Sequence, residues 1–356
     1  MKQHRLFFFA VLPLLCLGCA QKGVTFSAQF EDGKLVFHSE DQAAFLKGPY
    51  NEIPKYAHGD KELSRPLSSV LTWTGGEAPY TVTIKESAGK TVSFQTNDTS
   101  YNLVNLKLDT TYEYSVADRN AVLKEDSFTT EDGIVRNLYV SGVTNVRDVG
   151  GYPLNGKRTK QGLLFRGARL NENKTEEVTP VVNEKGKKTL LEDFGIKTEI
   201  DLRRVDNNEV GGLVEGGAGV LGEGVAYYQC PMRYDSKMPG ILNDNGLRKT
   251  FGILGKKENY PIYFHCSIGT DRTGYVSWLI NAYLGVEEDY LWKDYLFSNF
   301  GNIDGSRVVS SISNGYVQNI KNAQGETLSE KAKTYLLARG VEEAELQVLR
   351  EMMLGE

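Results

Sequence analysis

Short runs of alternating polar and apolar residues fill the chain between residues 24 and 131. Clusters of Gly, Asn and Asp separate these runs, which occupy residues 35–38, 70–73, 80–84, 91–94 and 111–116. A period of two places every second side chain on one face of a strand, and such strands joined by turn residues are typical of an antiparallel sandwich. The pattern predicts an all-β sandwich module over residues 24–131, with Trp73, Tyr112 and Tyr114 in its core.

From residue 134 the hydrophobic period changes, and apolar strands alternate with segments of helical spacing. The predicted strands are residues 163–166, 197–203, 225–230 and 260–265. The predicted helices are residues 188–194, residues 274–284 and at least two more within residues 329–354. Alternating strands and helices indicate an α/β domain over residues 134–356, with a mainly parallel sheet flanked by helices.

The first nineteen residues have the layout of an export signal. A basic start with Lys2 and Arg5 precedes an apolar run at residues 6–17, which is too short to span a bilayer comfortably. The run closes on Gly18 and Cys19 and resembles a bacterial lipoprotein signal. That resemblance implies removal of residues 1–18, lipidation of Cys19 and anchoring to a membrane of the cell envelope after export. A transmembrane anchor and an ordinary cleaved signal are the alternatives.

Composition narrows the function classes. Of 356 residues, 40% are hydrophobic and 24% charged, which fits a globular protein and excludes a disordered or polytopic membrane chain. The 41 Lys and Arg stand against 46 Asp and Glu, so no general basic field is present to bind nucleic acid. A G-x-G-x-x-G spelling at residues 217–222 neither follows a predicted strand nor opens a helix, and no dinucleotide cofactor is expected.

The four cysteines do not form a disulfide framework. Cys16 and Cys19 belong to the leader, which leaves Cys230 and Cys266. Two interpretations stay open at this point. The two thiols form a regulatory disulfide, or one of them is a reactive nucleophile.

The strongest chemical signal is the segment H-C-S-I-G-T-D-R-T-G at residues 265–274. It places Cys266 and Arg272 six positions apart, between a predicted strand and a predicted helix. Loop amides and a helix N-terminus together favour a phosphate dianion, and the same field lowers the pKa of a thiol. Gly269 gives the loop its conformational freedom, and the Thr273 hydroxyl is placed to hydrogen-bond the sulfur. The predicted phosphate-binding residues are Ser267, Ile268, Gly269, Thr270, Asp271, Arg272 and Thr273.

This segment resembles the HCx5R signature of the cysteine-dependent phosphatases, and its D-R-T-G ending is closest to the bacterial tyrosine and serine phosphatases. Three further segments resemble motifs of that subfamily in the same order, at residues 145–152, 163–168 and 200–203. The N-terminal module is similar to fibronectin type III or immunoglobulin-like domains. Thr270 stands where the subfamily usually has lysine, which argues against a preference for highly charged inositol lipids.

The resemblance implies a two-step reaction without a metal or another cofactor. The Cys266 thiolate attacks phosphorus to form a cysteinyl-phosphate, Arg272 holds the phosphoryl oxygens, and water hydrolyses the intermediate. Asp271 is the expected general acid, with Asp235 as the alternative, and Asp271 could instead only pair with a neighbouring arginine. The expected supporting residues are His265, Arg147, Asp148 and Asp201.

Three functions follow as hypotheses. The first is a lipid-anchored phosphatase acting on phosphotyrosine, with phosphoserine and phosphothreonine as further substrates. The second is an inositol-phosphate or phosphoinositide phosphatase. The third is a surface adhesin whose phosphatase-like domain only binds phosphate. The expected partners are a phosphorylated protein or small phosphomonoester and, through Cys19, a membrane. A protein partner of the β-sandwich cannot be derived from these patterns.

Overall fold

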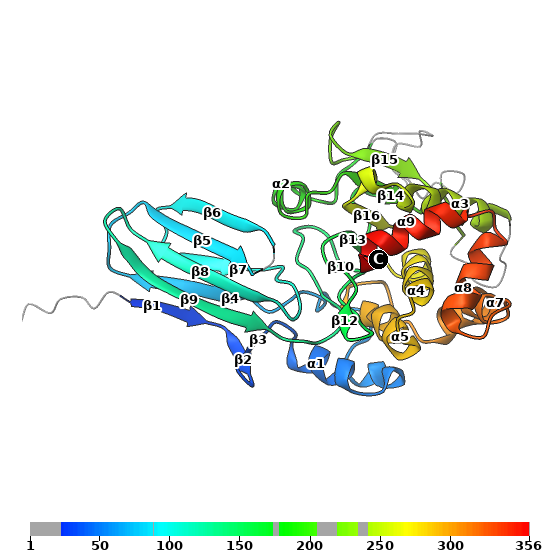
Figure 1. Cartoon of the computed structure of the whole chain (residues 1–356), viewed down its shortest axis with the longest axis horizontal. Coiled ribbons are helices and arrows are strands. Elements are labelled where there is room, and N and C mark those ends of the chain that lie inside the picture. Colours follow the sequence, from blue (N-terminus) through cyan, green and yellow to red (C-terminus); the bar gives the residue numbers. More distant parts are fainter. Residues whose placement is uncertain (1–22, 88, 174–177, 205–218, 234–240, 356) are drawn as a thin grey trace, which may run out of the picture. The chain divides into compact units, whose positions relative to one another are not determined.

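The computed structural model describes residues 23–87, 89–173, 178–204, 219–233 and 241–355. The chain divides into two compact units (Figure 1). The first unit comprises Met1–Ser27, Val70–Asn102 and Tyr112–Phe128, and the second comprises Ala28–Ser69, Leu103–Thr111 and Thr129–Glu356. The leader with Cys19, the alternative acid Asp235 and the glycine-rich residues 211–218 lie outside the described residues.

Strands make up the first unit. Its three-stranded sheet has the order β1-β4-β7, with β1 at Gly23–Ser27, β4 at Ser69–Thr74 and β7 at Ser100–Leu103. A six-stranded sheet contains four neighbouring strands in the order β9-β8-β5-β6. These strands are β5 at Tyr80–Glu86, β6 at Thr91–Thr96, β8 at Thr111–Ala117 and β9 at Val122–Thr130.

The aromatic residues that were predicted as core are buried in this unit. The Trp73 ring meets the Tyr80 ring edge to face at 5.6 Å, and Tyr112 stacks on Phe128. Trp73, Tyr112 and Tyr114 are each less than 10% exposed. The strands predicted at residues 70–73, 80–84, 91–94 and 111–116 are confirmed as β4, β5, β6 and β8. The fibronectin-like or immunoglobulin-like sandwich stays a prediction.

Residues 28–69 belong to the second unit, whereas the sequence predicts them as part of the N-terminal module. They form β2 at Gln29–Glu31, β3 at Lys34–Val36, helix α1 at Glu40–Lys47 and the 3-10 helix η1 at Tyr50–Lys55. A capping box between Ser39 and Gln42 starts α1. Phe45 of α1 packs against Phe300, and Tyr50 of η1 against Trp292. These aromatic contacts bury the segment there, so the predicted boundary at residue 131 is wrong for it.

The second unit contains the predicted α/β arrangement. Its five-stranded sheet has the order β10-β13-β16-β14-β15 and is parallel except for β10. These strands are β10 at Arg147–Asp148, β13 at Leu164–Gly167, β14 at Thr198–Asp201, β15 at Ala226–Gln229 and β16 at Ile262–His265. The short strands β11 at Pro153–Leu154 and β12 at Lys157–Arg158 form a separate pair.

Helices surround this sheet (Figure 1). They are α2 at Glu184–Lys188, η2 at Thr189–Asp193, α3 at Ile241–Leu254, η3 at Lys257–Asn259, α4 at Asp271–Leu284, α5 at Glu288–Phe297, η4 at Ser298–Phe300, α6 at Ser310–Ile312, η5 at Ser313–Val317, α7 at Gln318–Lys321, α8 at Leu328–Leu337 and α9 at Glu343–Leu354. Helix α4 starts three residues before its predicted start and is buried from its second residue onwards. It contacts β13, β16, α5 and α8. Within the described residues, no helix has the length and apolar character needed to cross a membrane.

Candidate active site

The loop at residues 266–270 joins the carboxyl end of β16 to the N-terminus of α4. β16 is the central strand of the sheet, and its last residue, His265, pairs with Gly167 of β13 on one side and with Asp201 of β14 on the other. Ligands of open α/β sheets bind beyond the carboxyl ends of the strands. The fourteen-residue helix α4 directs the positive end of its dipole at the same loop.

The carbonyl groups of this loop are hydrogen-bonded from its outer side. The Ser267 carbonyl accepts from the backbone N–H of Arg169 at 3.2 Å. The Asn145 amide donates to the carbonyls of Ile268 and Gly269 at 3.2 and 3.1 Å. The N–H groups of residues 267–270 have no protein acceptor among the described residues. Carbonyls bonded outward and N–H groups left for a ligand are what an anion cradle requires.

Gly269 occupies a position of the loop that requires glycine for two reasons, its backbone conformation and a close approach to another strand. Its φ is +70°, in the left-handed region that favours glycine. A Cβ there would lie 2.4 Å from the carbonyl carbon and oxygen of Gly167. The loop therefore passes so close to the end of β13 that only glycine fits.

Cys266 lies at the start of the loop with only 2% of its surface exposed. Burial by itself raises the pKa of its thiol, but the Arg272 charge and hydrogen bonds from the Thr273 hydroxyl and backbone N–H lower the pKa below the ordinary value. The Thr273 hydroxyl has no other hydrogen-bond partner among the described groups, which leaves it for the sulfur. Cys266 thus has the lowered thiol pKa that favours a thiolate at neutral pH.

A buried charged network lies directly behind the nucleophile. His265 Nε2 and Glu199 Oε1 are 2.9 Å apart, and the His265 Nδ1–H is 3.1 Å from the Cys266 carbonyl. Burial lowers the pKa of His265, but the carboxylates of Asp201 and Glu199 outweigh it and raise the pKa. Asp201 in turn accepts from Arg203 at 2.6 Å. His265 therefore contacts the loop at the Cys266 carbonyl, Asp201 lies 3.9 Å from His265 Nδ1, and the network includes Glu199, which the sequence reasoning missed.

A second network holds the loop from the helix side and is centred on Asp294 of α5. Asp294 is buried and accepts from Arg147 Nε at 2.7 Å and from Arg166 Nη1. Arg147 also donates to the Asn145 side chain, and Arg166 donates to the Gly269 carbonyl at 2.8 Å. Burial and the positive charge of Arg147 together lower the pKa of Arg166 to about 10, although the Asp294 carboxylate raises it. The two arginines reach the loop only because Asp294 compensates both charges.

Asp294→Asn is expected to lower the free energy of unfolding of the second unit by about 3–5 kcal/mol, because two buried guanidinium groups lose their counter-charge. Denaturant unfolding followed by tryptophan fluorescence measures this change. Glu343→Gln is the matched control, since Glu343 is 71% exposed and pairs with Lys333 at the surface. A loss no larger than that of the control would contradict the bracing role.

The stability difference between the wild type and Asp294→Asn should depend on pH. Burial raises the pKa of Asp294, but the charges of Arg147 and Arg166 outweigh it and lower the pKa below the ordinary value. The stability contributed by the carboxylate is then fully present above the unfolded-state pKa of about 3.9 and is lost as the pH falls through the folded-state value. The difference between wild type and Asp294→Asn should therefore shrink only in acid.

Asp271 is the first residue of α4 and is held by two side chains. Arg307 donates to both of its carboxylate oxygens, at 2.9 and 3.3 Å, and the Tyr295 hydroxyl donates to it at 3.2 Å. Burial lowers the pKa of Arg307, whereas Asp271 and, more weakly, the Cys266 thiolate raise it. Arg307 thus lies within electrostatic reach of the reacting sulfur, and no sequence pattern pointed to it.

Asp148 and Cys230, two residues that the sequence analysis connects with the site, make no contact with the loop at residues 266–270 among the described contacts. Asp148 pairs with Arg136 at 2.7 Å and accepts from two backbone N–H groups outside the loop, so it braces a neighbouring turn. Cys230 follows β15, which is separated from β16 by β14, and two strand spacings amount to about 10 Å. A disulfide needs Cα atoms within about 7 Å, and both thiols are free here, which argues against the predicted alternative of a Cys230–Cys266 bond.

A thiol of lowered pKa, a loop with outward-bonded carbonyls and an adjacent arginine at a helix N-terminus form the arrangement of a cysteine-type phosphatase. A model of the tyrosine phosphatase family matches residues 138–355, which is more than half of the chain. The chain belongs to this family. The family resemblance predicted from four motifs is confirmed, and the roles of the individual site residues stay predictions.

Two further similarities accompany the family match. A protein of Cupriavidus necator named as a tyrosine-protein phosphatase is 26% identical in an alignment of 185 residues that covers 47% of this chain. The chain spans 64% of the length of that relative. The solved core catalytic domain of a PP-IP phosphatase from S. cerevisiae, in complex with citrate, aligns with a TM-score of 0.29 and 14% identity over 44% of this chain and 85% of that chain.

Proposed function

We propose that this protein is an exported, lipid-anchored phosphatase that hydrolyses phosphomonoesters, phosphotyrosine above all, through a cysteinyl-phosphate intermediate. The observation that carries the proposal is the Cys266 thiol, whose pKa is lowered by Arg272 and Thr273 despite its burial. The name of the Cupriavidus necator relative supports the same reaction. Phosphoserine and phosphothreonine are further substrates of the proposed enzyme.

In the first step, the Cys266 thiolate attacks phosphorus from the side opposite the leaving oxygen. The S–P bond forms as the ester O–P bond breaks, and Arg272 and the loop N–H groups hold the three other oxygens. In the second step, water attacks phosphorus, the S–P bond breaks and inorganic phosphate leaves. The Thr273 hydroxyl stabilises the thiolate that is restored.

Asp271 supplies the proton for the leaving oxygen in the first step and accepts a proton from water in the second. Its place at the N-terminus of α4 puts it beside Arg272 in the chain and in the electrostatic neighbourhood of Cys266. Arg307 and Tyr295 fix the orientation of its carboxyl group. They are positioning residues in this mechanism, because they act through Asp271.

The cell envelope is the proposed location, and the support for it is the leader at residues 1–18 together with Cys19. Acylation of the Cys19 sulfur and of the new N-terminus would supply the two or more chains that stable anchoring requires. Cys19→Ser is expected to move the protein from the membrane fraction to another fraction of the cell. The lipid anchor would be contradicted if Cys19→Ser stayed in the membrane fraction and the wild-type protein incorporated no fatty acid.

Turnover of three substrates in the presence of EDTA tests the proposed activity. The reduced full-length protein, extracted in detergent, is assayed on a phosphotyrosine peptide, a phosphoserine peptide and inositol hexakisphosphate. We expect EDTA to have no effect and the phosphotyrosine peptide to give the highest kcat/KM. Faster turnover of inositol hexakisphosphate would favour the inositol-phosphate hypothesis instead. Binding of phosphate without turnover of any substrate would favour the adhesin.

A further inference from the structure

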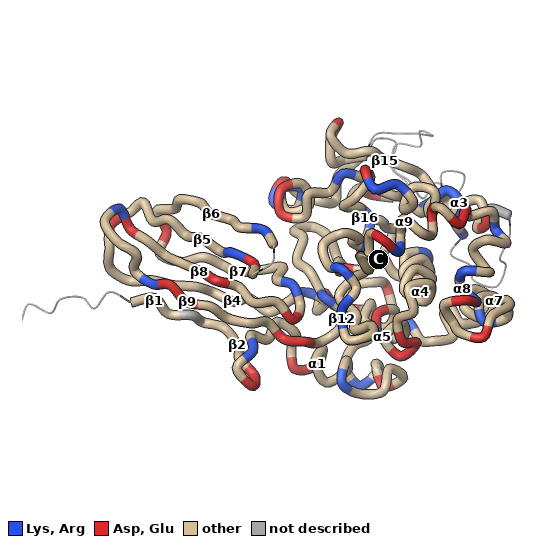
Figure 2. Tube along the Cα trace, viewed as in Figure 1, with Lys and Arg blue, Asp and Glu red and all other residues tan. Residues whose placement is uncertain are grey.

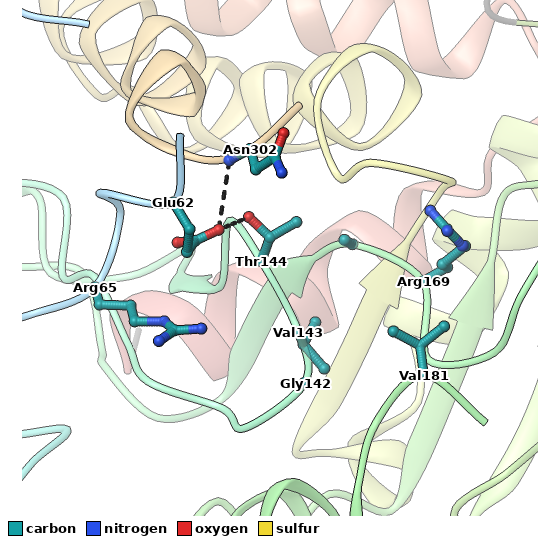
Figure 3. A pocket seen from close by; sticks show the side chains of 9 residues that line it. Glu62, Arg65, Gly142, Val143, Thr144, Arg169, Val181 and Asn302 are labelled. Atoms are coloured by element: carbon teal, nitrogen blue, oxygen red, sulfur yellow. Dashed lines mark hydrogen bonds between the residues drawn. The ribbon is translucent and has the colours of Figure 1, made fainter. Parts of the chain in front are cut away.

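A pocket of about 320 Å³ lies next to the loop at residues 266–270 (Figure 3). Arg169 lines the pocket, and its backbone N–H and its Nη1–H both donate to the Ser267 carbonyl, at 3.2 and 3.3 Å. Thr144 also lines the pocket and precedes Asn145, which bonds the loop carbonyls. The pocket and the phosphate loop therefore share a wall, on the side where the loop carbonyls are bonded.

Glu62 is the one carboxylate among the lining residues, and both of its oxygens accept hydrogen bonds from neighbouring residues. Its Oε1 accepts from the Ser64 hydroxyl at 2.5 Å. Its Oε2 accepts from the Thr144 hydroxyl and from the Asn302 backbone N–H (Figure 3). These bonds join three distant chain segments of the second unit. Glu62 therefore acts as a tie between segments, and its acceptor atoms are already used.

The two arginines of the pocket have donors to offer. The exposed Arg65 guanidinium lies over the Tyr139 ring at 5.1 Å and has neither a hydrogen-bond acceptor nor a carboxylate partner among the described residues. Arg169 pairs with Glu172 at 2.8 Å, yet its buried Nε–H lacks an acceptor within the described part of the chain. Figure 3 shows the two arginines on opposite sides of the pocket. A ligand with acceptor oxygens would satisfy these donors.

The rest of the lining selects among anionic groups. Val143, Val181 and Ala168 add apolar side chains between the arginines. A phosphate group is strongly hydrated over its whole surface and gains little from such a wall. A glutamate side chain ends in a carboxylate and carries methylene groups that bury favourably against valine. The mixed lining thus fits an acidic side chain.

Charged residues of both signs surround the pocket. Figure 2 shows acidic and basic residues interspersed along the described chain. Near the pocket, the Lys185 ammonium lies over the same Tyr139 ring at 5.7 Å. Glu172 is paired with Arg169, and Glu62 is bonded to neutral donors only, so among the described residues Arg65 is a cation at the pocket without a carboxylate partner.

We propose that this pocket binds an acidic side chain adjacent to the phosphorylated residue of a protein substrate, and that Arg65 is the residue that determines this specificity. The inference rests on the proposed function, because it names the substrate class of the same site. Glu62 and Arg65 precede residues 138–355, which the family model matches. The preference is therefore a property of the segment at residues 28–69 in this chain.

Two phosphotyrosine peptides that differ only in Glu or Gln beside the phosphotyrosine test the inference. The Glu peptide is expected to have about tenfold higher kcat/KM, mainly through KM, which corresponds to about 1.4 kcal/mol. Arg65→Gln should abolish this preference and leave turnover of p-nitrophenyl phosphate unchanged. Lys185→Gln is the matched control, since Lys185 contacts the same ring without lining the pocket, and it should keep the preference. High salt should reduce the preference of the wild type.

The outcomes separate this inference from the proposed function. Equal kcat/KM values for the two peptides, or a preference that survives in Arg65→Gln, would overturn the inference alone. Turnover of p-nitrophenyl phosphate without turnover of either peptide would contradict both the inference and the proposed action on phosphoproteins. Slower turnover of inositol hexakisphosphate in Arg65→Gln, with no change on the peptides, would show that the pocket takes phosphate and would overturn the assignment to a carboxylate.

Discussion

Cys266→Ser is expected to lower kcat on every phosphomonoester by at least about 10⁴-fold while phosphate binding persists. The site lowers the pKa of a thiol, and the resulting thiolate is the nucleophile. A serine hydroxyl at the same position stays protonated, because its intrinsic pKa is far higher than that of a thiol. Arg272 and the loop N–H groups are unchanged in this variant, so inorganic phosphate should still inhibit binding of a substrate peptide. Steady-state turnover and a competition binding assay measure the two effects.

Cys230→Ser is the matched control for this prediction. Cys230 is the other free thiol among the described residues, and it is buried, with burial raising its pKa to about 12. It therefore stays protonated at neutral pH and takes no part in the proposed reaction. The control should retain the wild-type kcat even where its stability falls. Comparable activity losses in both variants would show that thiol chemistry at Cys266 is not what drives turnover.

The phosphate loop could be predicted from the sequence because its chemistry is contiguous. Cys266, Gly269 and Arg272 lie within seven positions, and the strand before them and the helix after them have clear hydrophobic periods. The central strand of a parallel sheet is apolar on both faces, so β16 is recognisable without knowledge of its neighbours. The loop between β16 and α4 then follows from local structure alone.

The supporting residues could not be predicted in the same way, since they come from other elements. Asp294 lies on a helix, where a single carboxylate is normally expected to face solvent, and only the packing of α5 buries it between Arg147 and Arg166. Arg307 lies in a connection without a periodic pattern. Glu199 gives a weak signal, as a carboxylate inside a predicted strand of the sheet, because a buried carboxylate needs a partner.

The placement of residues 28–69 in the second unit could not be predicted for a different reason. The alternating pattern at residues 35–38 groups this segment with the strands that follow it, although Ser39 and Gln42 have the spacing of a helix capping box. Local propensity cannot tell which unit an amphipathic helix will cover, because that depends on an apolar surface formed far along the chain. Phe300 and Trp292 supply that surface here. This placement also brings Arg65 into the second unit.

Asp271→Asn is expected to lower kcat by about 10²–10⁴-fold on a phosphotyrosine peptide, because the leaving phenolate oxygen then lacks a proton donor. The loss should be much smaller for p-nitrophenyl phosphate, whose leaving group needs less protonation. The alkaline limb of the wild-type pH profile of kcat should also disappear in the variant, since the protonated acid is required only in the wild type. Initial rates on the two substrates across pH measure both effects. Asp304→Asn, at an exposed position of the connection that carries Arg307, is the control and should keep the wild-type profile.

The dependence on the leaving group separates catalysis from a purely structural ion pair. If Asp271 served only to hold Arg307, removal of its charge would distort the site equally for both substrates, and the alkaline limb would persist. If instead Asp271→Asn kept the wild-type sensitivity to the leaving group, the proton would have to come from another group, and Asp235→Asn would then be expected to show the loss. Arg307→Lys adds a graded test, because a lysine keeps the charge but not the two-pronged contact with the carboxylate. An intermediate loss on the peptide, again with little effect on p-nitrophenyl phosphate, is expected if Arg307 acts by orienting the acid.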